Sequence, residues 1–541
     1  MKRKIFYLVC ALCAGNAVFA QNSDLQRELT LEKEFSPTVR DADKINHTPE
    51  LQPVKKTTSA VSFSNFTMEP SLAPYFSTFQ APVYMTDFAT SQQQAYVRLG
   101  MGFLFHLDAD AGYQIFNTEK TRWNIFASHR SSNTSTGYLQ ADEHTRMKIN
   151  DNLIGTQFEH QFLSTRLTAG LQYNYLRFND YGWLDTTMTR RRNHRLQTYI
   201  GLGTTDANAD VLWQANIAYT LFAQQYPVLQ DYSGGNENRI LADIDLHKDW
   251  VGIAAAMTTY LYSTPLQDSI AKATGNVNYT TFVLNPYVYY EDDLWDARLG
   301  LTANIRVGGV RKILIAPKVS FRWRPTDAVL FYAIADGGLV DNSHFNVRQE
   351  NRYIAPMWRV KDAGSPLDAK LGVSFSPFIN TGFEIFTGYK YIKDEHFYTA
   401  DSIVYDNAGV FSLGGKATYS YRNSFDISAQ VVFNHWNMKH ETAAWNRPIF
   451  AGDLAVGYQL PAIPIRMDLN YHLETGRKAN IHGLSEKMKN IHDLKFSANY
   501  MLNSQVSLFV EANNLLFQKY DFWYGYPSQG MYCMAGASVK F

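Results

Sequence analysis

The chain has 541 residues, and its 50 lysines and arginines balance its 50 aspartates and glutamates. This length exceeds one ordinary soluble core, and the neutral charge disfavours nucleic-acid binding, which requires a basic excess against phosphates. Tyrosine and phenylalanine number 34 each and tryptophan 10, a supply of rings that suits surfaces lying between apolar and wet surroundings.

Residues 1–20 have the organisation of a cleaved secretory signal peptide. A positively charged start, an apolar stretch and a small-residue cleavage signal ending at Ala20 follow one another. Cleavage would remove Cys10 and Cys13 and leave Cys533 alone, so an intramolecular disulfide is not expected in the mature chain. The sequence therefore predicts an exported protein.

Residues 21–94 differ in composition from the rest of the chain. They are rich in Thr, Ser, Pro, Lys and Glu and lack sustained periodicity, so this N-terminal segment is not expected to fold alone. Each ring buried inside a barrel would contribute about 1.5 to 3 kcal/mol, against an ordering cost of about 1 to 2 kcal/mol per residue. A lumenal plug and a periplasmic tether that docks a partner both remain open. The candidate plug or partner side chains are Phe35, Phe63, Phe66, Tyr75, Phe76, Phe79 and Tyr84.

Residues 95–541 show alternation of apolar and polar residues with period two. In 298–307 and 465–474, for example, one row is apolar and the other polar or charged. Such alternation is the signature of strands with two different faces, and no apolar run is long enough for a membrane-spanning helix. The predicted fold class is all-β, a transmembrane antiparallel up-and-down β-barrel of about 22 strands.

A soluble β-sandwich would also alternate, but the connections favour a membrane barrel. Tight turns such as 206–210 and 502–504 alternate with longer polar loops such as 133–147, 345–366 and 479–489. Short turns on one side and long loops on the other are typical of outer-membrane barrels. Aromatic residues also gather near strand ends, as in an interfacial girdle. With an even number of strands, the N- and C-terminal ends of the barrel chain are both expected to lie in the periplasm.

The last two predicted strands carry a family resemblance. Residues 506–520 run as an alternating strand into Asn514-Leu515-Leu516-Phe517, and the chain ends in Val539-Lys540-Phe541. This part resembles the C-terminal strands of TonB-dependent outer-membrane receptors, and with the strand count the resemblance covers residues 95–541. The overall character is similar to that of Bacteroidota receptor-like barrels. The N-terminal segment is shorter than a classical plug and shows no clear TonB-contact box.

The resemblance implies a location in the outer membrane of a Gram-negative bacterium and a role in substrate uptake. The partners it implies are outer-membrane lipid, the barrel-insertion machinery during biogenesis, and a TonB-type, other periplasmic or lipoprotein partner. An alternative remains open: a non-transporting structural or assembly component that docks a periplasmic partner through the N-terminal segment.

The polar rows of the strands supply the candidate lumen-facing residues. Their charges are of both signs, which disfavours a dedicated anion or cation pore and suits a wet lumen. The candidates are Arg298, Arg306, Lys318, Arg322, Lys416, Asp426, Arg466, Asp468, His472, Glu474 and Glu511.

Catalytic signals are weak. His435 and His440 are five residues apart, which in a strand places them on opposite faces and disfavours a metal pair. No Gly-x-Ser-x-Gly elbow occurs. The sequence therefore predicts a protein that is not an enzyme, without catalytic, cofactor-binding or metal-binding residues.

Overall fold

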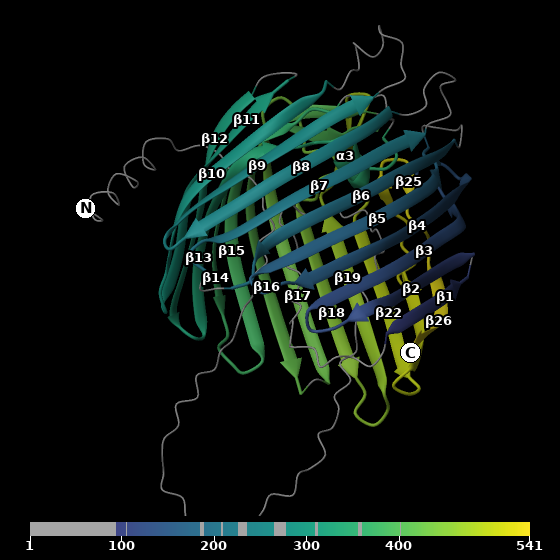
Figure 1. Ribbon diagram of the computed structural model, residues 1–541. Helices are drawn as coiled ribbons and strands as arrows, with labels where there is room; N and C mark the ends of the chain where they lie inside the picture. The colour runs from purple at the N-terminus through teal and green to yellow at the C-terminus, as the bar shows by residue number, and fades with distance from the viewer. Residues whose placement is uncertain are drawn as a thin grey trace, which may run out of the picture.

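The computed structural model describes residues 94–541 except 104, 184–188, 207–208, 226–234, 264–276, 309–311, 355–359, 401 and 423. The described residues form one closed antiparallel barrel of 22 strands (Figure 1). The predicted fold class is confirmed, and so is the predicted number of strands. The predicted signal peptide and the seven aromatic residues predicted to form a plug or partner contact lie outside the described residues.

The barrel strands follow one another in chain order around the wall. They are β1 (Ala95–Gly102), β2 (His106–Asn117), β3 (Thr121–Gly137), β4 (His144–Gln161), β5 (Thr165–Asn179), β6 (Arg190–Thr204), β7 (Leu212–Gln225), β8 (Gly235–Lys248), β9 (Val251–Ser263), β10 (Tyr279–Glu291), β11 (Trp295–Val307), β12 (Lys312–Thr326), β13 (Val329–Val340), β14 (Ala363–Phe375), β15 (Thr381–Tyr398), β16 (Ile403–Tyr421), β17 (Phe425–Met438), β18 (Phe450–Gln459), β19 (Ile465–Thr475), β22 (Ile491–Met501), β23 (Val506–Asn513) and β26 (Tyr532–Lys540).

Three further elements lie in the connections between barrel strands. The helix α3 (His344–Glu350) follows β13, and two small hairpins, β20 (Lys478–Ile481) with β21 (Leu484–Lys487) and β24 (Asp521–Trp523) with β25 (Tyr526–Pro527), follow β19 and β23. None of the described helices is long and apolar enough to cross a bilayer.

The barrel closes where the first strand meets the last. β1 pairs with β26 over residues 96–102, and the backbone N–H groups of Gln94 and Ala95 both donate to the carbonyl of Phe541 at 2.8 Å. A side chain at Gly536 would meet the Leu99 carbonyl oxygen at 2.1 Å, so this close strand pairing requires glycine there. Closure leaves the sheet without a free edge.

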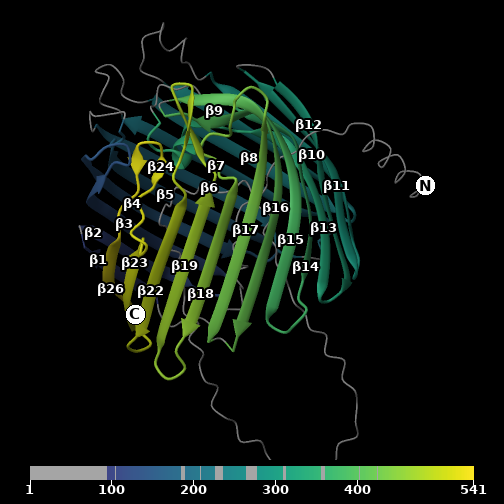
Figure 2. The same cartoon turned by 180° about the vertical axis from the view of Figure 1, so that it is seen from behind.

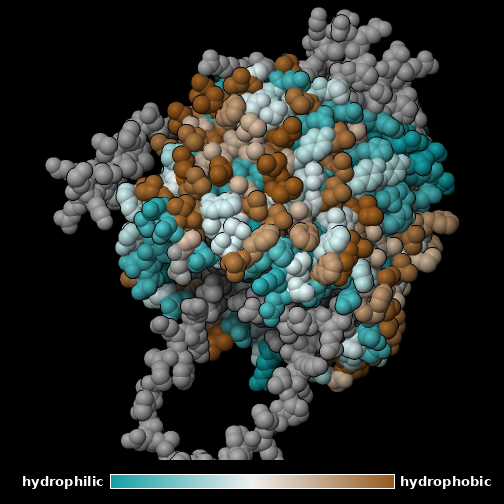
Figure 3. Space-filling model, in the orientation of Figure 1, coloured by the Kyte–Doolittle hydropathy of each residue, from teal (hydrophilic) through white to brown (hydrophobic). Residues whose placement is uncertain are grey.

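Apolar rows cover the outside of the wall. Ile154 is 61% exposed and Ile217 62%, and many other large apolar side chains on the outer rows are exposed as well. Figure 3 shows such brown surface spread over the wall between hydrophilic areas. Water would disfavour so much exposed apolar surface, whereas a bilayer would cover it. The exterior therefore matches a barrel that stands in a membrane.

Turns are short at one end of the barrel and connections are mostly long at the other, which Figure 2 shows with the short turns at the lower end. The predicted loop 133–147 is wrong in extent, since β3 runs to Gly137 and β4 begins at His144. In the part of β3 that extends beyond the predicted boundary, the Thr136 hydroxyl donates to the carbonyl of Ser528 at 2.9 Å. The predicted loop 345–366 contains most of α3 and the start of β14. The predicted loop 479–489 contains most of the hairpin β20–β21.

Thiol labelling tests which end faces the medium. In a Cys533→Ser background we expect an impermeant thiol reagent on whole cells to label Asp142→Cys and Ser485→Cys, which lie in the long connections. Lys120→Cys and Asp293→Cys, which lie in exposed short turns, should react only after the envelope is permeabilised. Labelling of the short turns on intact cells would reverse the expected orientation.

Candidate functional site: a lumenal pocket beside a cross-lumen segment

The connection between β13 and β14 folds into the barrel mouth. Residues 341–354, here the cross-lumen segment, contain α3 and are largely buried, with Val347 only 1% exposed. Ser343 caps the helix, because its hydroxyl oxygen accepts a hydrogen bond from the Asn346 N–H at 3.1 Å. The helix ends where the N–H of Asn351 donates to the carbonyl of Val347 at 2.8 Å.

A carboxylate from the wall holds the start of the helix. Glu237 on β8 accepts hydrogen bonds from the backbone N–H groups of His344 at 2.5 Å and Phe345 at 3.3 Å. An anion at a helix N-terminus is favourable because the first N–H groups have no partner inside the helix. Burial and the neighbouring Arg348 lower the pKa of His344, which keeps its ring neutral at physiological pH. This end of the segment is thus fixed to β8.

The end of the helix is fixed to a different part of the wall by charge. Glu350 forms an ion pair with Arg447, which lies between β17 and β18, and its Oε2 lies 2.6 Å from His396 Nε2 on β15. Tyr398 donates its hydroxyl to Glu350 at 2.9 Å and Arg447 also lies 3.5 Å from Glu395. Burial raises the pKa of Glu350, but Arg447 and His396 outweigh it and hold that pKa well below its usual range. Glu350 is therefore a carboxylate anion that is 19% exposed and borders the pocket.

Beyond the helix the segment reaches the opposite side of the mouth. Arg191 on β6 donates to the carbonyl oxygens of Arg352 at 3.3 Å and Ile354 at 2.9 Å. Arg191 is itself held by Asp180 at 2.5 Å. Because the segment leaves the wall at β13 and is bound at β8, β15 and β6, it bridges distant strands of the barrel.

An aromatic cluster joins the segment to two other connections. Tyr353 stacks on Tyr526 with ring centroids 4.2 Å apart, and Tyr181 lies edge-on to both rings at 5.4 Å. The Tyr181 hydroxyl donates to the carbonyl of Pro527 at 3.2 Å. The connections β5–β6, β13–β14 and β23–β26 thus pack together. Trp523 of the last connection also lies edge-on to Tyr398 at the end of β15, with ring centroids 4.7 Å apart.

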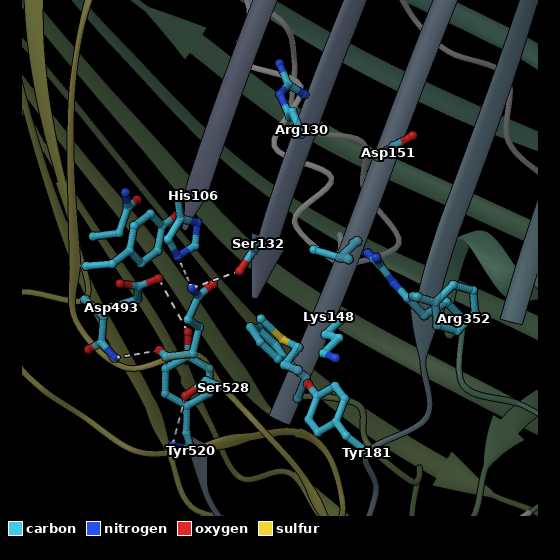
Figure 4. A pocket seen from close by; sticks show the side chains of 18 of the residues that line it. His106, Arg130, Ser132, Lys148, Asp151, Tyr181, Arg352, Asp493, Tyr520 and Ser528 are labelled. Carbon is cyan, nitrogen blue, oxygen red and sulfur yellow. Dashed lines mark hydrogen bonds between the residues drawn. The ribbon is translucent and has the colours of Figure 1, made fainter. Parts of the chain in front are cut away.

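A pocket of about 280 Å³ lies inside the barrel beside this cluster (Figure 4). Strands β2 to β5 line one side of it and β19, β22 and β26 the other, while Arg352, Tyr353 and Tyr520 come from the connections. The wall contributes His106, Asp108, Arg130, Ser132, Met147, Ile149, Asp151, Phe178, His472, Glu474, Ile491, Asp493, Lys495, Tyr532 and Met534, among others.

The pocket combines aromatic surface with charges of both signs. Asp493 accepts the hydroxyl of Tyr520 at 3.4 Å and lies 3.9 Å from Lys495, and His106 stacks on Tyr532 at 4.2 Å. One oxygen of Asp493 is buried without a hydrogen-bond partner. Within the described residues no group of three His, Cys, Asp or Glu is placed to hold a metal ion. The arrangement suits the binding of a polar solute that carries apolar or ring surface.

The structure places most of the predicted lumen-facing residues in ion pairs, some between strands and some within a strand or with a connection. Only His472 and Glu474 of that set line the pocket. Lys416 lies opposite Glu384 and Gln430 in the sheet register. The other pairs are Arg298 with Asp245 at 3.8 Å, Arg306 with Asp362, Lys318 with Asp336 at 3.0 Å, Arg322 with Asp296 at 2.8 Å, Asp426 with Arg466 at 3.0 Å, Arg466 with Asp468 at 2.9 Å, His472 with Asp453 at 2.7 Å, Glu474 with Arg477 at 3.4 Å, and Glu511 with Arg98.

The residues that fix the cross-lumen segment and form the aromatic cluster escaped the sequence analysis. Glu350, Arg447 and His396 come from connections and strands far apart in the chain, and no motif links them. The three tyrosines of the cluster were visible only as general aromatic enrichment. The length of the predicted loop 345–366 was the one available signal, since long connections often carry function.

No protein-family model and no curated protein matches the sequence. Among solved structures, the ferripyoverdine receptor of the outer membrane of Pseudomonas aeruginosa is similar at 11% identity and a TM-score of 0.62, over 83% of this chain and 72% of that one. The FrpB iron transporter from Neisseria meningitidis is similar at 10% identity and a TM-score of 0.65, over 83% and 82%. The ferric enterobactin receptor of Pseudomonas aeruginosa is similar at 12% identity and a TM-score of 0.63, over 83% of this chain and 80% of that one. The chain has the barrel fold of TonB-dependent receptors.

Proposed function

We propose that this protein is an outer-membrane uptake barrel of the TonB-dependent receptor type. The observation that carries the proposal is the pocket of about 280 Å³, which is built from the inner wall and from connections at the loop end. A solute would enter from the loop end, which faces the medium, bind in this pocket, and leave toward the short turns.

Three features support the proposal. A barrel of 22 strands is too wide for its wall side chains to fill, so its lumen is available to a ligand or a plug. The predicted polar row, which includes His472 and Glu474, would face this lumen. The fold is shared with barrels described as siderophore or iron receptors, although a shared fold does not transfer their cargo.

In this proposal the chain is a Bacteroidota-type barrel in which residues 21–94 follow the cleaved leader and act as a reduced plug. A TonB-type, other periplasmic or lipoprotein partner would engage that segment. No catalytic step is proposed.

A second function is favoured by the cross-lumen segment. Because it bridges β13, β8, β15 and β6 at the mouth, the barrel has a closing element of its own. A closed barrel suits a structural or assembly component, and residues 21–94 would then dock a periplasmic partner.

Planar-bilayer recording of the full-length protein and of a variant lacking residues 22–90 separates these functions. Uptake through a plugged barrel predicts that conductance rises on truncation, because the plug is removed. Affinity capture from solubilised envelopes is run on both proteins. A truncated barrel that stays closed and has lost a partner protein would overturn the plug and support the scaffold.

A further inference from the structure

The run Arg190-Arg191-Arg192 at the start of β6 divides between the two faces of the wall. Arg191 points inward and is 6% exposed, in contact with Asp180 and the cross-lumen segment. Arg190 and Arg192 are exposed and belong to the outer row, which continues through Ile200, 55% exposed. Two guanidinium groups therefore stand on the outside of the barrel at the loop end.

Neighbouring strands add two more cations to the same surface. Arg177 lies on the outer row of β5 with the exposed Leu171 and Tyr173, and it is directly opposite Arg192 in the register. Arg146 is exposed and lies on the outer row of β4, which includes Ile154 at 61% exposure. Asn150 of that row is opposite Arg177, so the rows are adjacent. These four residues, Arg146, Arg177, Arg190 and Arg192, are called the outer basic patch.

The described residues supply no counter-charge to this patch. None of its four members forms an ion pair within the part of the chain that the structure describes. The outer rows of β3 to β6 at this end carry Ser, Asn, His and Tyr beside these cations, and no Asp or Glu. Like charges directly opposite in a sheet, as Arg177 and Arg192 are, repel each other. An external anion would relieve that repulsion.

The height of the patch on the wall indicates where the anion comes from. Tyr173 lies on the same row four residues before Arg177, and its hydroxyl is 2.7 Å from His194 Nδ1. Tyrosines of this kind mark the membrane interface, and four residues of a strand tilted by about 40° rise about 10 Å along the membrane normal. The patch therefore stands on the medium side of the interface, from where long arginine side chains extend toward the lipid head groups. In Figure 3 hydrophilic surface gathers at the right-hand edge, over the loop-side ends of β3 to β6.

We infer that the outer basic patch binds the phosphate groups of phosphorylated lipids in the outer leaflet. Guanidinium groups bind phosphate oxygens in bidentate fashion, and exposed basic clusters at a membrane surface attract anionic lipids. The lipid is the committed source of phosphate, since its acyl chains contact the exposed apolar rows that continue from the patch. This inference rests on the proposed orientation of the loops toward the medium and is independent of transport.

Lipid binding to the purified full-length protein in detergent tests the inference. The probes are bis-phosphorylated lipid A, the same lipid after enzymatic removal of its phosphates, and inorganic phosphate, with bound lipid counted by native mass spectrometry. We expect the double variant Arg177→Gln/Arg192→Gln to bind bis-phosphorylated lipid A about tenfold more weakly than the unaltered protein. The control Lys120→Gln/Arg324→Gln removes two exposed cations from the short-turn end of the barrel and should bind normally.

Heat-modifiable migration on gels verifies that each variant is folded. Equal binding by the double variant, or equal binding of the dephosphorylated lipid, would overturn the inference. Full displacement of the lipid by an equimolar amount of inorganic phosphate would assign the patch to free phosphate instead. Polyglutamate serves as a fourth probe, and its binding without any binding of phosphorylated lipid would point to an acidic protein partner and would also overturn the inference.

Discussion

Replacement Glu350→Gln is expected to release the cross-lumen segment from the wall. The substitution leaves Arg447 buried at 6% exposure without its main counter-charge, and breaking a buried pair in this way costs about 3 to 5 kcal/mol. Arg348 and Arg352 on either side of Glu350 then become accessible to trypsin. We expect limited proteolysis of the folded barrel to give cleavage after Arg348 or Arg352. We also expect a higher conductance when Glu350→Gln is combined with deletion of residues 22–90.

Two controls define what this result means. Glu441→Gln removes a carboxylate whose one side-chain hydrogen bond within the described residues is from the Trp445 indole N–H at 2.8 Å, so it should leave cleavage unchanged. The double replacement Glu350→Gln/Arg447→Met removes both charges of this pair and should restore much of the protection, because no buried Arg447 cation is left without Glu350, while Glu395 keeps His396 at 3.6 Å. If Glu350→Gln is cleaved no faster than the unaltered protein, the ion pair does not hold the segment.

A charge placed on the outer row of β17 is expected to destabilise the barrel strongly. Val431 is 46% exposed and lies midway along this strand. Arginine near the bilayer midplane costs about 2 to 4 kcal/mol on a lipid-facing position. We therefore expect Val431→Arg to lower the free energy of unfolding by that amount, measured by urea titration of the protein folded into lipid vesicles.

The adjacent residue provides a matched control on the other face. Gln430 lies opposite Lys416 on one neighbouring strand and Asp453 on the other, so an added cation meets one charge of each sign. Gln430→Arg should change the unfolding free energy by less than about 1 kcal/mol. Equal losses of unfolding free energy for the two variants would contradict the assignment of the outer row to lipid and would favour a water-soluble sheet.

The candidate site was predictable only in part. Alternation along 465–474 identified His472 and Glu474 as members of a polar row, and both line the pocket. The same reasoning gave no account of Glu350, Arg447 or His396, because their partnership joins a connection to two distant parts of the wall. The predicted loop 133–147 was too long for a related reason: Thr136 contacts the connection 514–531 through the carbonyl of Ser528, a partner that no local sequence pattern indicates.

By itself the sequence determined the fold class, the number of strands and the face on which most side chains lie. These features follow from a local rule, since successive residues of a strand point to opposite sides and each turn reverses the chain. Tertiary structure alone decided that the connection after β13 turns inward, that three connections meet at Tyr181, Tyr353 and Tyr526, and that cations of β4, β5 and β6 share one patch. The physical reason is that these contacts depend on strand register and on closure of the barrel, which bring together residues that no sequence period relates.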